Sequence, residues 1–179
     1  MKNIILITLF AALLTACGSA EDKDIVSDSV IADSEQEKLT EVVNDGHNLP
    51  LEFTLTNLQG EPVSASDYRG QWLVLNYWAT WCAPCRDEIP ELVRFQEEHE
   101  NVQILGIAFE DATIEKLNNF AADFNVNYPL LTLDIYNPPS FAAEGGLGLP
   151  TTIVYNPEGM RHKKHMGPID YPGLLELIQ

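Results

Sequence analysis

The segment that most constrains this chain runs from Trp72 to Pro90 and reads WLVLNYWATWCAPCRDEIP. Its first seven residues form an almost wholly apolar run, which predicts a buried β-strand. A short turn then leads into Cys82-Ala-Pro-Cys85, and from Arg86 to Glu100 the apolar residues recur at helical spacing. Two thiols are therefore expected where a buried strand gives way to the first turn of a helix.

The first sixteen residues predict export. Lys2 precedes an apolar run, Ile4–Leu14, that is too short to span a bilayer comfortably and is typical of a signal peptide. Leu14-Thr-Ala-Cys17 resembles the lipobox of bacterial lipoproteins, which implies cleavage before Cys17 and a lipid on that residue. The alternative is an ordinary secretory signal. We expect residues 1–16 to be removed and the protein to be held outside the cytoplasm, on the periplasmic face of an inner or outer membrane.

Residues 17–48 predict a flexible, acidic tether. They carry nine acidic residues and only two lysines, so they cannot bury enough apolar surface to offset their ordering entropy. An acidic binding tail is the alternative. The whole chain has a formal net charge of −17, which disfavours nucleic acid as a partner and attachment through a polybasic patch to anionic lipid.

The C-x-x-C pair allows four interpretations. A structural zinc site needs four ligands, and the chain has no second cysteine pair to complete one. A structural disulfide across so small a loop would stabilise the fold by only about 2 kcal/mol on the entropy model. Unlinked core cysteines fit a cytosolic protein better than an exported one. The redox interpretation fits best, because the start of a helix favours the Cys82 thiolate, and Cys85, one turn on, can resolve a mixed disulfide. No metal or cofactor is expected.

Residues 49–179 alternate strands with helices. Strands are predicted near 52–56, 72–78, 102–109, 128–133 and 149–155, and Asn156-Pro-Glu-Gly159 predicts a hairpin turn into a strand at 160–166. Helices are predicted over 86–100, from Asp111 onward and over 171–178, the second burying a stripe made of Ile114, Leu117, Phe120, Ala121 and Phe124. This order predicts a three-layer α/β/α sandwich.

The stretch Trp78-Ala-Thr-Trp-Cys-Ala-Pro-Cys-Arg86 resembles the signature of thioredoxin-like proteins, and its extension back to Asn76 resembles the TlpA/ResA branch. Pro90 and Gly148-Leu-Pro-Thr-Thr152 resemble further landmarks of that family, and the resemblance covers about 49–179. It implies a thioredoxin-like fold with a mixed central sheet and an insert between the active-site unit and the cis-proline strand. It also implies a membrane-anchored bacterial reductase. Some reductases of this branch serve cytochrome c maturation.

The resemblance also assigns the site. It implies that Cys82 attacks, that Cys85 resolves, and that the Leu149–Pro150 bond is cis; a trans proline opening an edge strand is the alternative. The expected substrate contacts are Trp81, Ala83, Pro84, Leu149 and Pro150. Trp81 is also expected to shield the disulfide, and Trp78 to pack in the core.

Proton transfer is expected to differ from that of thioredoxins proper. Those proteins place a buried aspartate six residues before the first cysteine, where this chain has Asn76, which cannot accept a proton. Another base or water must therefore accept the proton. Glu88 lies three residues after Cys85 on the same helical face, and the resemblance to the ResA-like branch implies that a glutamate here modulates the cysteines, which makes it the candidate. The alternative is an exposed surface glutamate paired with Arg86 or with lysine side chains.

The function predicted from these features is disulfide reduction on a substrate protein, which could be apocytochrome c, with a membrane thiol transporter as electron donor. A dithiol oxidase would use the same residues in reverse, and the reduction potential decides between the two. A binding module that has lost catalysis is the third hypothesis. Peroxidase activity is disfavoured because the P-x-x-x-T-x-x-C arrangement is absent.

One basic cluster, Arg161-His-Lys-Lys-His165, stands out in the acidic domain. Strand alternation predicts that His162 and Lys164 share one face and that His165 lies on the other, which disfavours a metal site. A solvated edge strand is expected, with docking to an acidic partner as the alternative.

Overall fold

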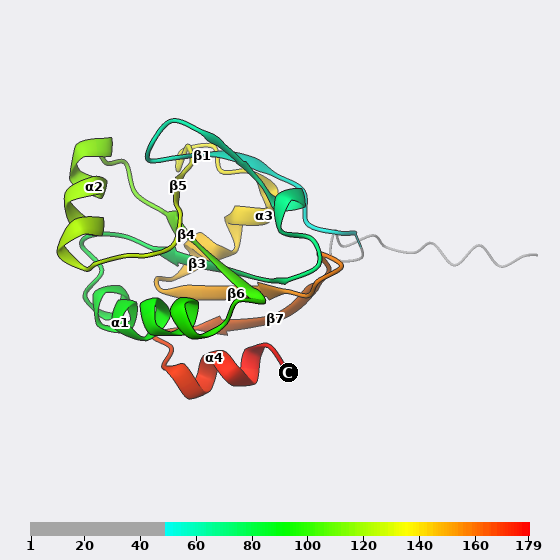
Figure 1. Cartoon of the computed structure of the whole chain (residues 1–179). Helices are drawn as coiled ribbons and strands as arrows, with labels where there is room; N and C mark the ends of the chain where they lie inside the picture. The colour runs from blue at the N-terminus through cyan, green and yellow to red at the C-terminus, as the bar shows by residue number, and fades with distance from the viewer. Residues whose placement is uncertain (1–48) are drawn as a thin grey trace, which may run out of the picture. The chain divides into compact units, whose positions relative to one another are not determined.

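The computed structural model describes residues 49–179 (Figure 1). The predictions of a signal peptide over 1–16, a lipid on Cys17 and a tether over 17–48 lie outside the described residues. Within 49–179, no helix combines the length and apolar character that crossing a membrane requires.

A seven-stranded sheet forms the centre of the described domain, in the order β2-β1-β5-β4-β3-β6-β7 (Figure 1). The strand β3 pairs in parallel with β4, which pairs in parallel with β5, whereas the remaining pairs are antiparallel. The strands are β1 (Thr54–Asn57), β2 (Pro62–Ser64), β3 (Trp72–Trp78), β4 (Val102–Ala108), β5 (Leu130–Thr132), β6 (Thr151–Tyr155) and β7 (Arg161–Met166). The sheet is therefore mixed, as predicted.

The helices complete two outer layers. They are η1 (Ala65–Tyr68), α1 (Ala83–Glu98), α2 (Ile114–Asp123), α3 (Ser140–Ala143), η2 (Gly145–Leu147) and α4 (Tyr171–Leu177). One core cluster joins β3 to residues of α1, α2 and α4, and the other joins β3 to residues of η1 and α3. We call the two sides of the sheet the α1 face and the α3 face. The three-layer prediction is confirmed, with a much thinner layer on the α3 face.

The central strand β3 supplies both cores because successive side chains point to opposite faces. Val74, Asn76 and Trp78 are buried on the α1 face, and Leu73, Leu75 and Tyr77 are buried on the α3 face. Asn76 is the polar member of this series. An unpaired polar group in a buried core costs free energy. The hydrogen-bond partners of Asn76 therefore show which side chains β3 brings together.

Several predicted elements differ in their bounds, among them one strand and one helix that contribute to the core. The strand predicted over 128–133 is limited to Leu130–Thr132, and the helix predicted from Asp111 begins at Ile114, capped by the Thr113 side chain. Leu117 and Phe120 are buried as predicted, but Ile114 is 44% exposed. Ile114 is the first helical residue and lies a turn short of the part of α2 that packs on the core, so its place on the buried stripe was wrong.

The basic cluster forms the edge strand β7, but its predicted alternation is wrong. Tyr155 pairs with Arg161 and Val154 pairs with Lys163, so His162 is the extra residue of a β-bulge. The bulge separates His162 from Lys164. The His162 ring lies against the carbonyl of Gln179, whereas Lys164 Nζ donates to a Glu144 carboxylate oxygen at 3.1 Å. Glu144 also forms an ion pair with Arg161, so part of the basic cluster is bound within the chain.

Candidate active site

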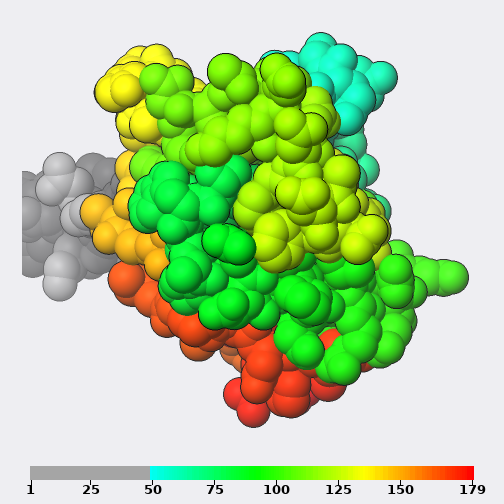
Figure 2. Space-filling model, turned by 90° about the vertical axis from the view of Figure 1, so that its left-hand side faces the viewer, coloured from blue at the N-terminus to red at the C-terminus, as the bar shows by residue number. Residues whose placement is uncertain are grey.

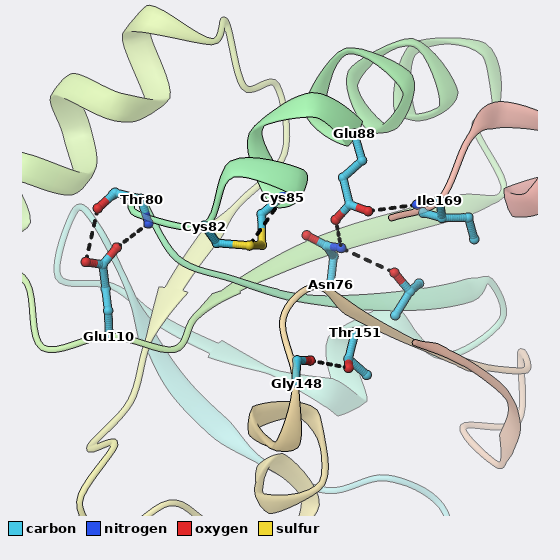
Figure 3. Close-up of a disulfide and its surroundings, with 10 residues drawn as sticks. Asn76, Thr80, Cys82, Cys85, Glu88, Glu110, Gly148, Thr151 and Ile169 are labelled. Carbon is cyan, nitrogen blue, oxygen red and sulfur yellow. Dashed lines mark hydrogen bonds between the residues drawn. A yellow bond between two sulfur atoms is a disulfide. The ribbon is translucent and has the colours of Figure 1, made fainter. Parts of the chain in front are cut away.

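The dithiol lies where the sequence places it, between β3 and α1 (Figure 3). After Trp78 the chain turns, and the Cys82 N–H donates to the Ala79 carbonyl at 3.1 Å. Cys82 is the N-cap of α1, and its Sγ accepts the Cys85 N–H at 3.3 Å. The two cysteines form a disulfide, so the structure holds the oxidised state. Pro84 lies in the first turn, where its missing N–H costs no helical hydrogen bond.

The two sulfur-bearing residues differ in accessibility. Cys82 is 4% exposed, whereas Cys85 is fully buried in the same core cluster. Ala83 and Pro84 are exposed, and Trp81 is 68% exposed. A substrate approaching from solvent therefore meets Cys82 first. Trp78 packs in the core as predicted, with its ring stacked on Phe120.

Helices α1 and α2 lie side by side at this end of the domain, where the guanidinium of Arg86 lies 5.6 Å from the centre of the Phe124 ring (Figure 2). Arg86, which directly follows the second cysteine, is therefore directed towards α2. Arg86 was one of the partners that the surface-pairing alternative offered for Glu88.

Glu88 is buried, with only 2% of its surface exposed, so the alternative of an exposed surface glutamate is wrong. Asn76 Nδ2 donates to Glu88 Oε1 at 2.8 Å and to Thr152 Oγ1 at 3.2 Å, and the Ile169 N–H donates to Glu88 Oε2 at 2.9 Å (Figure 3). The carboxylate of α1 is thereby joined to β3, to β6 and to the segment before α4. Cys85 lies one helical turn before it, on the same face.

Burial raises the pKa of Glu88 to about 7, and the hydrogen bonds from Asn76 and Ile169 offset part of that rise. Both partners are neutral donors, so they stabilise the carboxylate without supplying a positive charge. Tyr128 is buried nearby, and its own pKa is raised by burial and by the charge of Glu88. Glu88 can therefore gain or lose a proton near neutral pH.

The loop before β6 carries the predicted cis-proline. The Leu149–Pro150 bond is cis, as the resemblance implied. Pro150 is buried, and Leu149 packs against the core cluster that contains both cysteines. The Thr151 hydroxyl donates to the Gly148 carbonyl at 2.6 Å, which closes the loop on itself (Figure 3). Leu149 also packs against the core cluster of the α3 face, so it lies between the two cores at this end of the sheet.

A second carboxylate lies on the other side of the dithiol, and the sequence analysis missed it. The Thr80 N–H donates to Glu110 Oε1 at 2.5 Å, the Thr80 hydroxyl donates to Oε2 at 3.1 Å, and Lys116 Nζ donates to Oε2 at 2.8 Å. A signal for it exists in the sequence. Trp78 pairs with Ala108 in the parallel β3–β4 ladder, so two residues further along, Thr80 and Glu110 come level.

Comparison with known proteins places the chain in a family. Residues 46–160 match the model of the AhpC/TSA family. The chain belongs to this family. Thioredoxin-like protein YneN of Bacillus subtilis is 30% identical over 70% of this chain and 73% of its own length. Thiol-disulfide oxidoreductase ResA of the same organism is 31% identical over 66% of this chain and 65% of its own length.

A solved structure of a secreted thiol-disulfide isomerase from Corynebacterium glutamicum matches with a TM-score of 0.61 and 27% identity, over 72% of this chain and 81% of that one. These three similar proteins confirm the predicted resemblance to ResA-like proteins and the predicted thioredoxin-like fold. They also confirm the prediction of a thiol-disulfide oxidoreductase.

Proposed function

We propose that this thiol-disulfide oxidoreductase acts as a protein disulfide reductase outside the cytoplasm, with Cys82 as its attacking thiol. The observation that supports this role best is the asymmetry of the pair. Cys82 keeps 4% of its surface exposed at the start of α1, whereas Cys85 is fully buried and has a buried carboxylate, Glu88, one turn away.

The reduced enzyme begins the reaction. The Cys82 thiolate attacks one sulfur of a substrate disulfide, forming a mixed disulfide and releasing the other substrate sulfur as a thiolate. Cys85 then attacks the Cys82 sulfur, releases the second substrate thiolate and forms the Cys82–Cys85 disulfide. Two electrons pass to the substrate, and the product is the oxidised state that the structure holds.

Glu88 supplies the proton acceptor for the second attack. Cys85 has to lose its proton inside the core, where a charged thiolate is costly. The Glu88 oxygens accept hydrogen bonds from Asn76 and Ile169, and each keeps a second lone pair that can take a proton. A pKa of about 7 suits this transfer, because such a group accepts and returns a proton at neutral pH.

The N-terminal sequence and the family support our proposal for the location and the partners. The apolar run before Cys17 and the lipobox-like Leu14–Cys17 support a chain that is exported and anchored through a lipid. The secreted isomerase of related sequence supports export as well. A disulfide that must be reduced again outside the cytoplasm needs a thiol donor, for which we propose a membrane thiol transporter. Apocytochrome c is one candidate substrate.

Insulin reduction by the purified protein tests the reaction, with Cys82→Ala as the inactive control. We expect turnover with the natural chain and a dithiol reductant, and none with the variant. The redox state of Cys82–Cys85 in the cell envelope tests the direction. Mostly reduced thiols support the reductase, whereas a mostly oxidised pair would favour the dithiol oxidase.

A further inference from the structure

We propose that Glu110 is a positioning residue for the reaction: it fixes the turn that presents Cys82, while Lys116 fixes Glu110. Glu110 does not touch the reacting sulfurs in this proposal. It acts through Thr80, which lies two residues before Cys82. The inference rests on the proposed role of Cys82 as the attacking thiol.

The contacts of Glu110 form a three-donor clamp. One carboxylate oxygen accepts the Thr80 N–H, and the other accepts the Thr80 hydroxyl and the Lys116 ammonium. The Glu110 side chain is only 5% exposed, although it belongs to the loop between β4 and α2. Hydrogen bonds to an ionised acceptor are the stronger kind, and two of them on one residue restrain both its backbone and its side chain.

One side of this turn is not covered by other side chains. An open pocket of about 490 Å³ lies beside Thr80 and is otherwise lined by residues of α2 and its cap, including Thr113, Lys116 and Phe120. On that side the turn faces open space, so the hydrogen bonds to Glu110 add a restraint on Thr80 to the bond from the Cys82 N–H to the Ala79 carbonyl.

A carboxylate is the group that suits this position. Three donors converge on it, and a glutamine there would place its own NH₂ group against one of them. Burial alone would raise the pKa of Glu110, but the hydrogen bonds from Lys116 and Thr80 outweigh it, and the pKa lies below its usual range. Lys116 also balances a negative charge that would otherwise disfavour a thiolate at Cys82.

The positioning role and a purely electrostatic role predict opposite changes at Cys82. Glu110→Ala removes a negative charge and leaves Lys116 without its partner, so electrostatics alone would lower the pKa of the Cys82 thiol. Release of the turn would instead let the sulfur move away from the start of α1, and the pKa of that thiol would rise.

The experiment measures insulin reduction and the pH dependence of Cys82 alkylation by iodoacetamide in the reduced protein. For Glu110→Ala we expect insulin reduction to fall about tenfold, since a misplaced reacting group costs one to two orders of magnitude, and the Cys82 pKa to rise. Asp111→Ala is the matched control. It removes the neighbouring charge, which is hydrogen-bonded to Tyr136 and not to the turn, and it should change neither quantity.

Two milder variants keep the test informative if Glu110→Ala fails to fold. Thr80→Val removes only the hydroxyl donor, and Glu110→Gln keeps the size of the side chain. Both should shift the two quantities in the same directions by smaller amounts. An unchanged or lowered Cys82 pKa together with insulin reduction within twofold of the natural chain would overturn the inference. Insulin reduction that survives Cys82→Ala would instead overturn the proposed function.

Discussion

Glu88 and Glu110 lie on opposite sides of the dithiol and are both largely buried, yet their acidities are shifted in opposite directions (Figure 3). Glu88 receives hydrogen bonds from an amide and a backbone N–H, and its pKa rises to about 7. Glu110 has the Lys116 ammonium among its donors, and its pKa falls. Burial raises the pKa of both groups. At Glu110, which is less buried, the hydrogen bonds from Lys116 and Thr80 outweigh that rise, whereas the two hydrogen bonds at Glu88 offset only part of it. One carboxyl group can exchange a proton in the working range, while the other stays ionised and can hold a backbone in place.

The largest effect on the contrast between Glu88 and Glu110 is expected when a second carboxyl group is placed beside Glu88. Asn76→Asp replaces the amide donor 2.8 Å from Glu88 Oε1 with a carboxyl group. The two acids can share one proton at low pH but cannot both ionise without leaving uncompensated buried charge. We expect a loss of about 4 kcal/mol of unfolding free energy at pH 8 and little loss at pH 5. Urea unfolding at both pH values measures it, and equal losses at the two would contradict the explanation.

Glu88→Gln should remove a pH dependence from stability. The folded-state pKa of about 7 lies above the ordinary value of 4.5, so the native state binds the extra proton between these pH values. Protonation of Glu88 contributes on the order of 3 kcal/mol to the free energy of unfolding. This contribution is fully present below pH 4.5 and is lost as the pH rises through about 7. Urea unfolding from pH 4.5 to pH 8 should show a flatter profile for the variant than for the natural chain. Parallel profiles would refute the raised pKa.

The same variant tests the proposed proton transfer. Without a carboxylate beside Cys85, we expect the resolving step to slow about tenfold at pH 7, a modest value for loss of a general base, and the cysteine pKa values to change. Stopped-flow decay of a mixed disulfide measures the step, and thiol titration measures the pKa values. Glu91→Gln, on the same helix but hydrogen-bonded to Arg94 and Tyr171, is the matched control and should leave both unchanged. An unaltered resolving rate in Glu88→Gln would remove Glu88 from the mechanism.

The smallest effect is expected at the ion pair of Glu110. Lys116→Met removes the cation but leaves both hydrogen bonds from Thr80 in place. Because the Lys116 side chain is 51% exposed, we expect a loss of only about 1 kcal/mol of stability at pH 7. The pKa of Glu110 should rise towards its ordinary value, which titration followed by NMR of the carboxyl carbon can detect. A pKa that stays low would show that Thr80 alone sets it.

The fold and the dithiol could be predicted from the sequence because their signals are local. The apolar run of β3, the C-x-x-C spacing and the proline at 150 each occupy a few adjacent residues. The burial of Glu88 was not predictable in the same way, because its partner Ile169 is 81 residues further along the chain. Thr152, which shares the Asn76 amide, is similarly remote at 76 residues.

The errors have equally specific causes. One extra residue at His162 reversed the facing of everything after it in β7, and strand alternation carries no signal for a bulge. Glu110 was overlooked although the parallel register of β3 and β4 places it level with Thr80. The lesson from that pair is that polar residues following two adjacent parallel strands have to be considered together, even when only one strand leads into a recognisable motif.

The unequal accessibility of the two cysteines also allows the enzyme to be used to identify its substrate proteins, its clients. Cys85 has no exposed surface, so changing it to serine leaves the outer contour of the protein as it was. The variant would still capture a client through Cys82 but would have no second thiol with which to let it go. Each captured chain would stay covalently attached at its reactive cysteine, ready to be identified by mass spectrometry from intact cells.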